Sequence, residues 1–207
     1  LEIASELSIA LQAGDNAALK SLPQRLEPHQ LEICAKWRLR DGEGQILGQD
    51  ESSPPYGETL AHACAYAGAN TLLQRLLSTS GKADLVRRRG LTSGFTALHS
   101  AVAGGHLETC RMLLDAGAKV TTASTSRRSA LWTACVKGLR EVAMLLIEYS
   151  ADPYAAPQGA ESAVDALRRI GSKAAMKLHA ELLAMGASLV GVSAAAEQGE
   201  EEGEEGE

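Results

Sequence analysis

Aromatic residues are scarce in this chain of 207 residues, which contains two Trp, four Tyr and one Phe. Proteins that bind single-stranded nucleic acid need aromatic side chains on which the bases stack. Domains that bind nucleic acid also tend to carry a strong excess of positive charge, whereas the formal net charge here is −6. Both observations disfavour a nucleic-acid partner.

The sequence also lacks the motifs of common catalytic sites. It has no G-x-S-x-G nucleophile elbow, no G-x-x-x-x-G-K-[ST] phosphate loop and no H-E-x-x-H zinc motif. We therefore expect no catalytic residue, no cofactor, no metal site and no small-molecule substrate. Since no run of about 18 apolar residues exists, we also expect no insertion into a membrane.

The four cysteines, Cys34, Cys64, Cys110 and Cys135, form no C-x-x-C pair. Isolated cysteines at apolar positions are typical of reduced, buried thiols. Reduced thiols favour a cytoplasmic location, with the nucleus as an alternative, because disulfides form mainly in secreted proteins. The enzymatic alternative that stays open is a cysteine nucleophile that meets a histidine in space.

Negative charge is concentrated at the C-terminus. Seven Glu fall between Glu197 and Glu207, and without them residues 1–196 have a formal net charge of +1. We expect residues 191–207 to form a disordered acidic tail. This tail could contact the basic clusters Arg87-Arg88-Arg89 and Arg127-Arg128 within the same molecule. It also resembles the Glu/Gly-rich tails of tubulins, a resemblance that implies a cytoskeletal or ciliary location.

Four segments of the chain can be aligned with one another. They open at Thr59, Thr96, Ser129 and Ser162, at spacings of 37, 33 and 33 residues. The segment that opens at Thr96 continues Ala-Leu-His-Ser-Ala, then Gly-His-Leu-Glu, and closes with Leu-Leu and Gly-Ala. Such self-similarity at a fixed period indicates a repeat architecture rather than a closed globule.

Within each copy the apolar spacing predicts a pair of helices. In the copy that opens at Thr96, the helices are expected at 97–103 and 107–115, with an apolar stripe on the second. Leu98 and Leu131 are the expected central core. Small residues on the first helices, among them Ala65, Ala101 and Ala134, would let successive copies approach closely.

These motifs resemble the ankyrin-repeat family, whose marks are T-P-L-H-x-A and a period near 33 residues. The resemblance implies an all-α solenoid of helix pairs with β-hairpin fingers. On this interpretation residues 1–190 form the ankyrin-repeat domain. It comprises a degenerate N-terminal capping helix pair (1–26), an enlarged finger (27–57) and four repeats (58–190). The repeats run at about 59–90, 96–123, 129–156 and 162–189, and the last acts as a C-terminal cap.

The same resemblance implies roles for individual side chains. His62 and His99 would bond to the backbone of the neighbouring hairpin, and Trp132, which replaces the histidine in the next copy, could still donate one hydrogen bond. Phe95 is placed at an outward position of its finger, where it would contact a partner, or alternatively it packs against the neighbouring finger.

The resemblance further implies a non-catalytic scaffold or adaptor that binds a partner protein of unknown identity on its concave face. The alternative is an assembly chaperone or inhibitor that masks its partner transiently. The expected contact residues lie on the fingers and first helices: Tyr56, Glu58, Tyr66, Thr92, Ser93, Phe95, Arg128, Val136, Lys137 and Arg169.

Overall fold

The structure, a computed structural model, describes residue 27 and residues 59–79, 82–90, 93–156 and 159–197. The expected N-terminal helix pair, the enlarged finger apart from residue 27, and residues 198–207 lie outside the described residues. So do three of the expected contact residues, Tyr56, Glu58 and Thr92.

The described residues form four helix pairs, each joined by a short turn. The pairs are α4 (Leu60–Ala67) with α5 (Asn70–Thr79), α7 (Ala97–Gly104) with α8 (Leu107–Asp115), α9 (Ala130–Val136) with α10 (Arg140–Glu148), and α11 (Ala163–Ile170) with α12 (Lys173–Glu197). A short helix, α6 (Lys82–Arg87), lies between α5 and α7. The predicted all-α solenoid is confirmed for this part of the chain. Ala123 and Ser129, in the finger before α9, pair through an antiparallel β-bridge.

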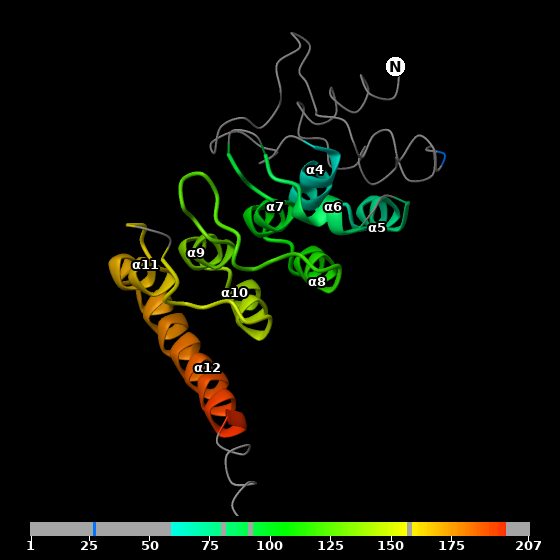
Figure 1. Ribbon diagram of the computed structural model, residues 1–207. Coiled ribbons are helices and arrows are strands. Elements are labelled where there is room, and N and C mark those ends of the chain that lie inside the picture. Colours follow the sequence, from blue (N-terminus) through cyan, green and yellow to red (C-terminus); the bar gives the residue numbers. More distant parts are fainter. Residues whose placement is uncertain (1–26, 28–58, 80–81, 91–92, 157–158, 198–207) are drawn as a thin grey trace, which may run out of the picture.

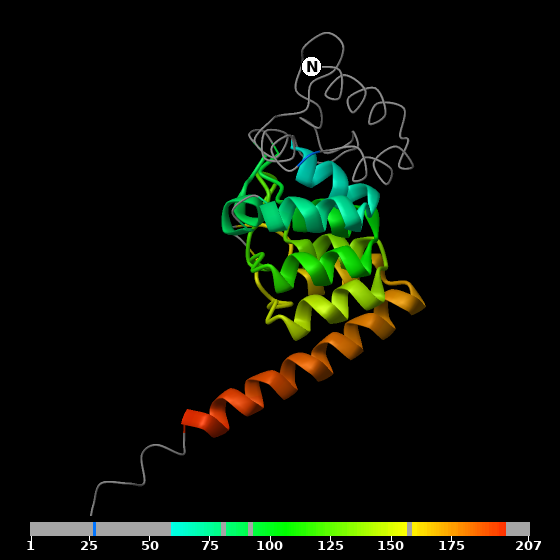
Figure 2. The same cartoon turned by 90° about the vertical axis from the view of Figure 1, so that its right-hand side faces the viewer.

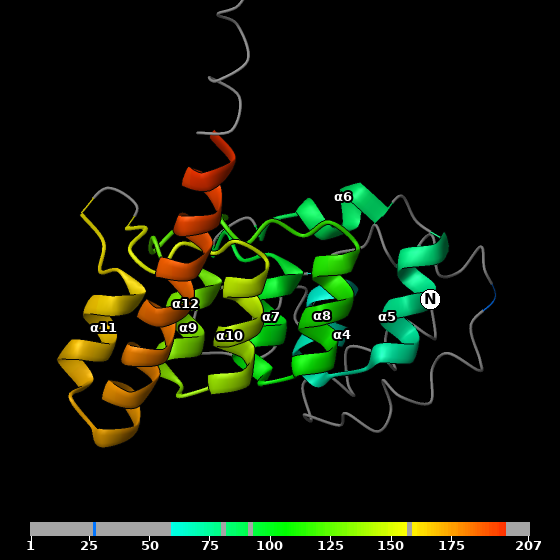
Figure 3. The same ribbon diagram turned by 90° about the horizontal axis from the view of Figure 1, so that it is seen from below.

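The pairs stack so that like helices lie beside one another. The first helices α4, α7, α9 and α11 form one row, and the second helices α5, α8, α10 and α12 form the other, as Figures 1 and 3 show. The segments that lead from one pair to the next, residues 80–95, 116–129 and 149–162, are called fingers below. The surface built from the fingers, the first helices and the turns that follow the first helices is called the finger face.

A continuous apolar core runs between the two rows. Leu98 of α7 and Leu131 of α9 are 0% and 2% exposed, so the prediction that they form the centre of the core is confirmed. The apolar stripe of α8 points into the same layer, where Cys110 and Leu113 are fully buried. Each repeat buries its apolar side against its neighbours, which is how a repeat stack is stabilised.

Small side chains let the first helices approach closely. Ala65, Ala101 and Ala134 are fully buried between successive helices, as the sequence predicted. Gly104, at the end of α7, was not singled out from the sequence. A Cβ atom on this residue would lie 2.2 Å from the carbonyl oxygen of Tyr66, so only glycine fits at this backbone contact.

Helix α12 differs from the other second helices in length and direction. It has 25 residues, against nine in α10, and it runs diagonally away from the stack in Figure 2. The helix ends at Glu197, whereas the sequence placed the end of the folded domain at residue 190. Within the described residues, no helix combines the length and the apolar character needed to cross a bilayer.

Candidate functional site

A histidine side chain, that of His62, joins two successive repeats beneath the finger face. The Nε2 atom of His62 lies 3.0 Å from the backbone oxygen of Phe95, in the next finger. A carbonyl oxygen can only accept, so Nε2 carries the proton, and Nδ1 accepts from the hydroxyl of Thr59 at 2.7 Å. The bond from His62 to the neighbouring finger confirms the role that the family resemblance implied.

His99 repeats half of this arrangement. Its Nδ1 accepts from the backbone N–H of Thr96 at 3.3 Å and lies 2.9 Å from the hydroxyl of the same residue. Its Nε2 is buried and reaches no hydrogen-bond partner among the described residues, so the bond to the neighbouring hairpin that was expected of both histidines is seen there for His62 and not for His99. Burial lowers the pKa of His99 from 6.5 to about 4, although the nearby backbone carbonyl of Arg128 favours the protonated ring. The positive charge of Arg89 and the ring of His62 lower this pKa further.

This pKa predicts that the protein loses stability in mild acid. The folded state keeps His99 neutral down to about pH 4, whereas the unfolded ring takes up a proton below about pH 6.5. Between these two pH values protons bind preferentially to the unfolded state. The contribution of neutral His99 to the stability of the folded state is therefore complete above about pH 6.5 and is lost as the pH falls. Between about pH 7.5 and 4.5 we expect the free energy of unfolding to fall by about 2–3 kcal/mol from this residue alone.

Urea denaturation across this pH range measures the effect. The His99→Gln variant removes the titrating group, so its curve of unfolding free energy against pH should be flatter than that of the wild type by this amount. Parallel curves for the two proteins would contradict the assignment.

Four side chains of the last two repeats form a connected cluster on the finger face. The guanidinium carbon of Arg128 lies 4.6 Å from the centre of the Trp132 ring, within range of a cation–π interaction. The indole N–H of Trp132 donates to the carboxylate of Glu161 at 3.1 Å. Arg169 donates two hydrogen bonds to the same carboxylate, at 2.7 and 3.1 Å. We call these four residues the Arg128–Arg169 cluster.

The cluster holds its members in fixed orientations. The hydrogen bonds from Arg169 lower the pKa of the Glu161 carboxyl below its usual value, and the indole of Trp132 contributes in the same direction. A planar guanidinium that binds a carboxylate through two bonds, or that stacks on an indole, loses less freedom when it meets a partner. Arg128 and Arg169 were expected on this surface from the sequence, and the structure joins them through Trp132 and Glu161.

Two of the expected contact residues are buried. Phe95 is only 8% exposed, and its ring centre lies 5.4 Å from that of His99. The prediction of an outward Phe95 is therefore wrong, because the ring is buried against the imidazole of His99 on α7. Ser93 is 2% exposed, and its carbonyl accepts hydrogen bonds from the backbone and the hydroxyl of Thr125. It links two fingers and offers no free surface.

The other described contact residues lie on the first helices or the turns that follow them. Val136 is 37% exposed at the end of α9. Lys137 is exposed and donates to the backbone oxygen of Ala103 at 2.6 Å, so it bridges two repeats. Tyr66 is half-buried near the end of α4. The turns lie at the opposite ends of the first helices from the fingers. Residues at the turns therefore lie apart from the Arg128–Arg169 cluster, although they belong to the same row of helices.

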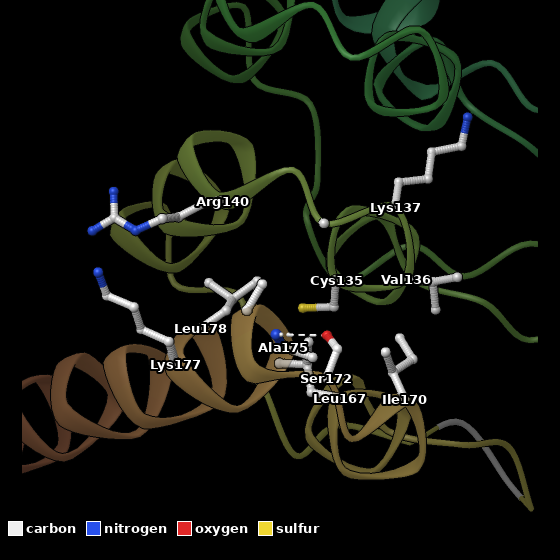
Figure 4. Close-up of a pocket in the computed structure, with 12 residues that line it drawn as sticks. Cys135, Val136, Lys137, Arg140, Leu167, Ile170, Ser172, Ala175, Lys177 and Leu178 are labelled. Carbon is white, nitrogen blue, oxygen red and sulfur yellow. Dashed lines mark hydrogen bonds between the residues drawn. The ribbon is translucent and has the colours of Figure 1, made fainter.

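A recess of about 400 Å³ opens at these turns, between the ends of α9 and α11 and the start of α12. Val136, Ile170 and Leu178 contribute apolar walls, as Figure 4 shows. The charged residues that line it are all basic: Lys137, Arg140 and Lys177. Glu181 reduces this charge, because its carboxylate accepts from Arg140 at 2.7 Å.

The described cysteines sit in the packed core. Cys64, Cys110 and Cys135 are free thiols and are 0–1% exposed. Burial raises the pKa of Cys64 well above its usual value and raises the pKa of Cys110 and of Cys135 to about 12. The thiolate is the reactive form, so these three thiols are poor nucleophiles at neutral pH. No group of three possible metal ligands is gathered within the part of the chain that the structure describes.

The match to a known family covers most of the chain. A family model described as "Ankyrin repeats (3 copies)" matches residues 7–124 and again residues 60–157. No curated protein sequence matches the chain. The matched residues include the stacked pairs from α4 to α10 and the bond from His62 of α4 to the following finger. The repeats seen in the sequence and in the structure therefore place this chain in the ankyrin-repeat family.

Proposed function

We propose that this protein is a scaffold or adaptor that binds a partner protein on its finger face. Ankyrin repeats generally serve as protein–protein interaction modules, and stacked repeats present extended concave surfaces to their partners. The observation that carries the proposal is the Arg128–Arg169 cluster, in which two arginines and a tryptophan are held in place on the finger face. Arginine, tryptophan and tyrosine dominate the residues that contribute most to binding at protein interfaces.

The outer row of helices is a poorer candidate for the same role. Its apolar residues turn inward to the core, as Leu113 and Leu146 do. Its exposed side chains include charged residues such as Glu108, Arg111 and Glu141. Glu is depleted at protein interfaces, whereas Arg and Trp, which the finger face presents in its cluster, are enriched there.

Site-specific photo-crosslinking tests the proposal. A photoreactive amino acid replaces Ser126, which is exposed in the finger that carries Arg128, and a matched variant carries it at Glu141, which is exposed on α10. In extracts of the source cells we expect the Ser126 variant to crosslink a discrete partner and the Glu141 variant to crosslink none. A partner that is trapped only from Glu141 would place binding on the outer row and contradict the proposal.

The lifetime of the complex without the crosslink separates a scaffold from a transient chaperone. A scaffold should co-purify with its partner in the final assembly without crosslinking. A chaperone or inhibitor should be trapped by the crosslinker and yet be missing from the finished assembly.

A further inference from the structure

Positive charge is segregated to the finger face. Among residues 59–185, the side chains described on the fingers, on α6, and on the first helices with the turns that follow them comprise nine Lys or Arg and four Asp or Glu, a net charge of +5. The nine basic residues are Arg87, Arg88, Arg89, Lys119, Arg127, Arg128, Lys137, Arg168 and Arg169, and the four acidic residues are Asp84, Asp152, Glu161 and Asp165.

The outer row of helices carries no such excess. Over the same range, α5, α8, α10 and α12 contain five basic and five acidic side chains, a net charge of zero. The basic residues are Arg75, Arg111, Arg140, Lys173 and Lys177, and the acidic ones are Glu108, Asp115, Glu141, Glu148 and Glu181. Over residues 59–185 the stack is therefore neutral on its outer row and basic on its finger face.

Backbone carbonyls orient two of these basic side chains within the described residues. Arg89 donates to the backbone oxygens of Gly94 and Ala123, at 3.1 and 2.5 Å, and Lys137 donates to that of Ala103. A carbonyl group orients a cation but carries no net charge to balance it. The four acidic residues are already included in the count, three of them as ion pairs with Arg88, Arg168 and Arg169.

We propose that the finger face binds an acidic, extended segment of a partner protein, whose carboxylates meet the basic residues of neighbouring fingers. This inference rests on the proposed function and adds the chemistry of the partner. Clefts lined by charge of one sign attract and select partners of the opposite sign. Arg side chains also fit carboxylates better than Lys because the planar guanidinium can donate two parallel bonds.

The acidic tail of the same molecule is the nearest alternative occupant. Helix α12 is 16 residues longer than α10, which is about 24 Å of additional helix, and it runs diagonally away from the stack (Figure 2). Residues 198–207 could span at most about 35 Å if fully extended. About 10 Å would then remain to reach back across the stack, which is about the distance between neighbouring helices.

A tail that returned toward the stack would first meet the finger of residues 149–162, whose charge would repel it. The charged side chains described in residues 149–162 are Asp152 and Glu161, both acidic. The basic fingers that carry Arg87 to Arg89 and Arg127 to Arg128 lie further along the stack. Geometry and charge thus favour a segment from another protein over the tail of the same chain.

Binding of an acidic probe to matched charge variants tests the inference. The probe is a fluorescein-labelled Glu/Ser peptide, and its affinity for the full-length protein is measured by fluorescence anisotropy at about 50 mM and about 500 mM NaCl. The test variant is Arg87→Gln/Arg128→Gln on the finger face. The control is Arg111→Gln/Lys173→Gln, at two exposed residues of the outer row, which changes the net charge by the same amount.

We expect the finger-face variant to bind the peptide about tenfold more weakly at low salt and the control to bind it as the wild type does. High salt should weaken wild-type binding and reduce the difference between the variants. Equal affinities for the two variants, or no binding by the wild type, would overturn the inference. An oligothymidine of the same charge that binds more tightly than the peptide would also overturn it, in favour of a nucleic acid.

A further variant reports on the tail. Replacing the six Glu of residues 200–207 with Gln in the full-length protein should leave the affinity for the peptide unchanged. Tighter binding would show that the tail occupies the finger face and would overturn a partner segment as its natural occupant. If the two charge variants bind the peptide equally while crosslinking from Ser126 persists, the inference of an acidic partner segment is wrong and the proposed function stands.

Discussion

Replacing Leu98 with alanine is expected to lower the free energy of unfolding by about 2–5 kcal/mol, the usual cost of truncating a buried leucine. Leu98 is 0% exposed and belongs to α7, which contacts both α4 and α9. A cavity at this position weakens the interfaces on both sides of one repeat. Because a repeat stack gains its stability from contacts between neighbours, the loss should affect the whole stack. Urea denaturation followed by circular dichroism measures it.

Met176→Ala provides the matched control for this substitution. Met176 is a residue of similar size on α12 and is 45% exposed. Its truncation leaves no buried cavity, so we expect a change within about 0.5 kcal/mol. Similar losses for the two variants would mean that Leu98 is not part of a packed core.

Replacing Phe95 with alanine is expected to lower the free energy of unfolding by about 3–5 kcal/mol, as for other buried phenylalanines. The ring is 8% exposed and packs against the imidazole of His99. The backbone of the same residue accepts hydrogen bonds from the Nε2 of His62 and from the N–H of Gly90. Loss of the ring would loosen the point at which two repeats and one finger meet. The melting temperature and the urea midpoint should both fall.

Tyr154→Ala is the control for Phe95→Ala. Tyr154 is an aromatic residue of another finger and is 59% exposed. We expect its truncation to change stability by less than about 0.5 kcal/mol, since an exposed ring leaves no cavity behind. A Phe95→Ala variant that kept its melting temperature but bound its partner more weakly would restore the outward interpretation of Phe95 that the structure rejects.

The repeats could be predicted from the sequence because their signals are local. The start of each copy at Thr59, Thr96, Ser129 and Ser162 is visible at a fixed spacing, and these four residues are the N-caps of α4, α7, α9 and α11. The helix pair at 97–103 and 107–115 matches α7 and α8 to within one residue. Apolar side chains at helical spacing and glycine at the turns are enough to specify such elements.

The candidate site was predicted only in part. Arg128 and Arg169 were placed on the binding surface because of their positions within their copies. The two arginines are connected through Trp132 and Glu161, which are 29 residues apart in the sequence. No sequence motif predicts this connection. An aromatic residue at the histidine position and an acidic residue just before the next copy were the available signals. These signals predict a contact only once the two repeats are known to lie side by side.

The amino-acid sequence by itself determined the family, the number and order of the described helix pairs, and the identity of the central core, since these depend on the period and on which side chains are apolar. The tertiary structure decided whether the side chain of each finger residue is buried or exposed. Phe95 is buried and Arg128 is exposed although both directly precede the start of a copy, at Thr96 and Ser129. A finger has no helical or strand periodicity to fix the direction of its side chains, so the contacts with the neighbouring repeat fix it instead. The segregation of charge follows from the same cause, because residues scattered along the sequence meet on one surface only when the repeats stack.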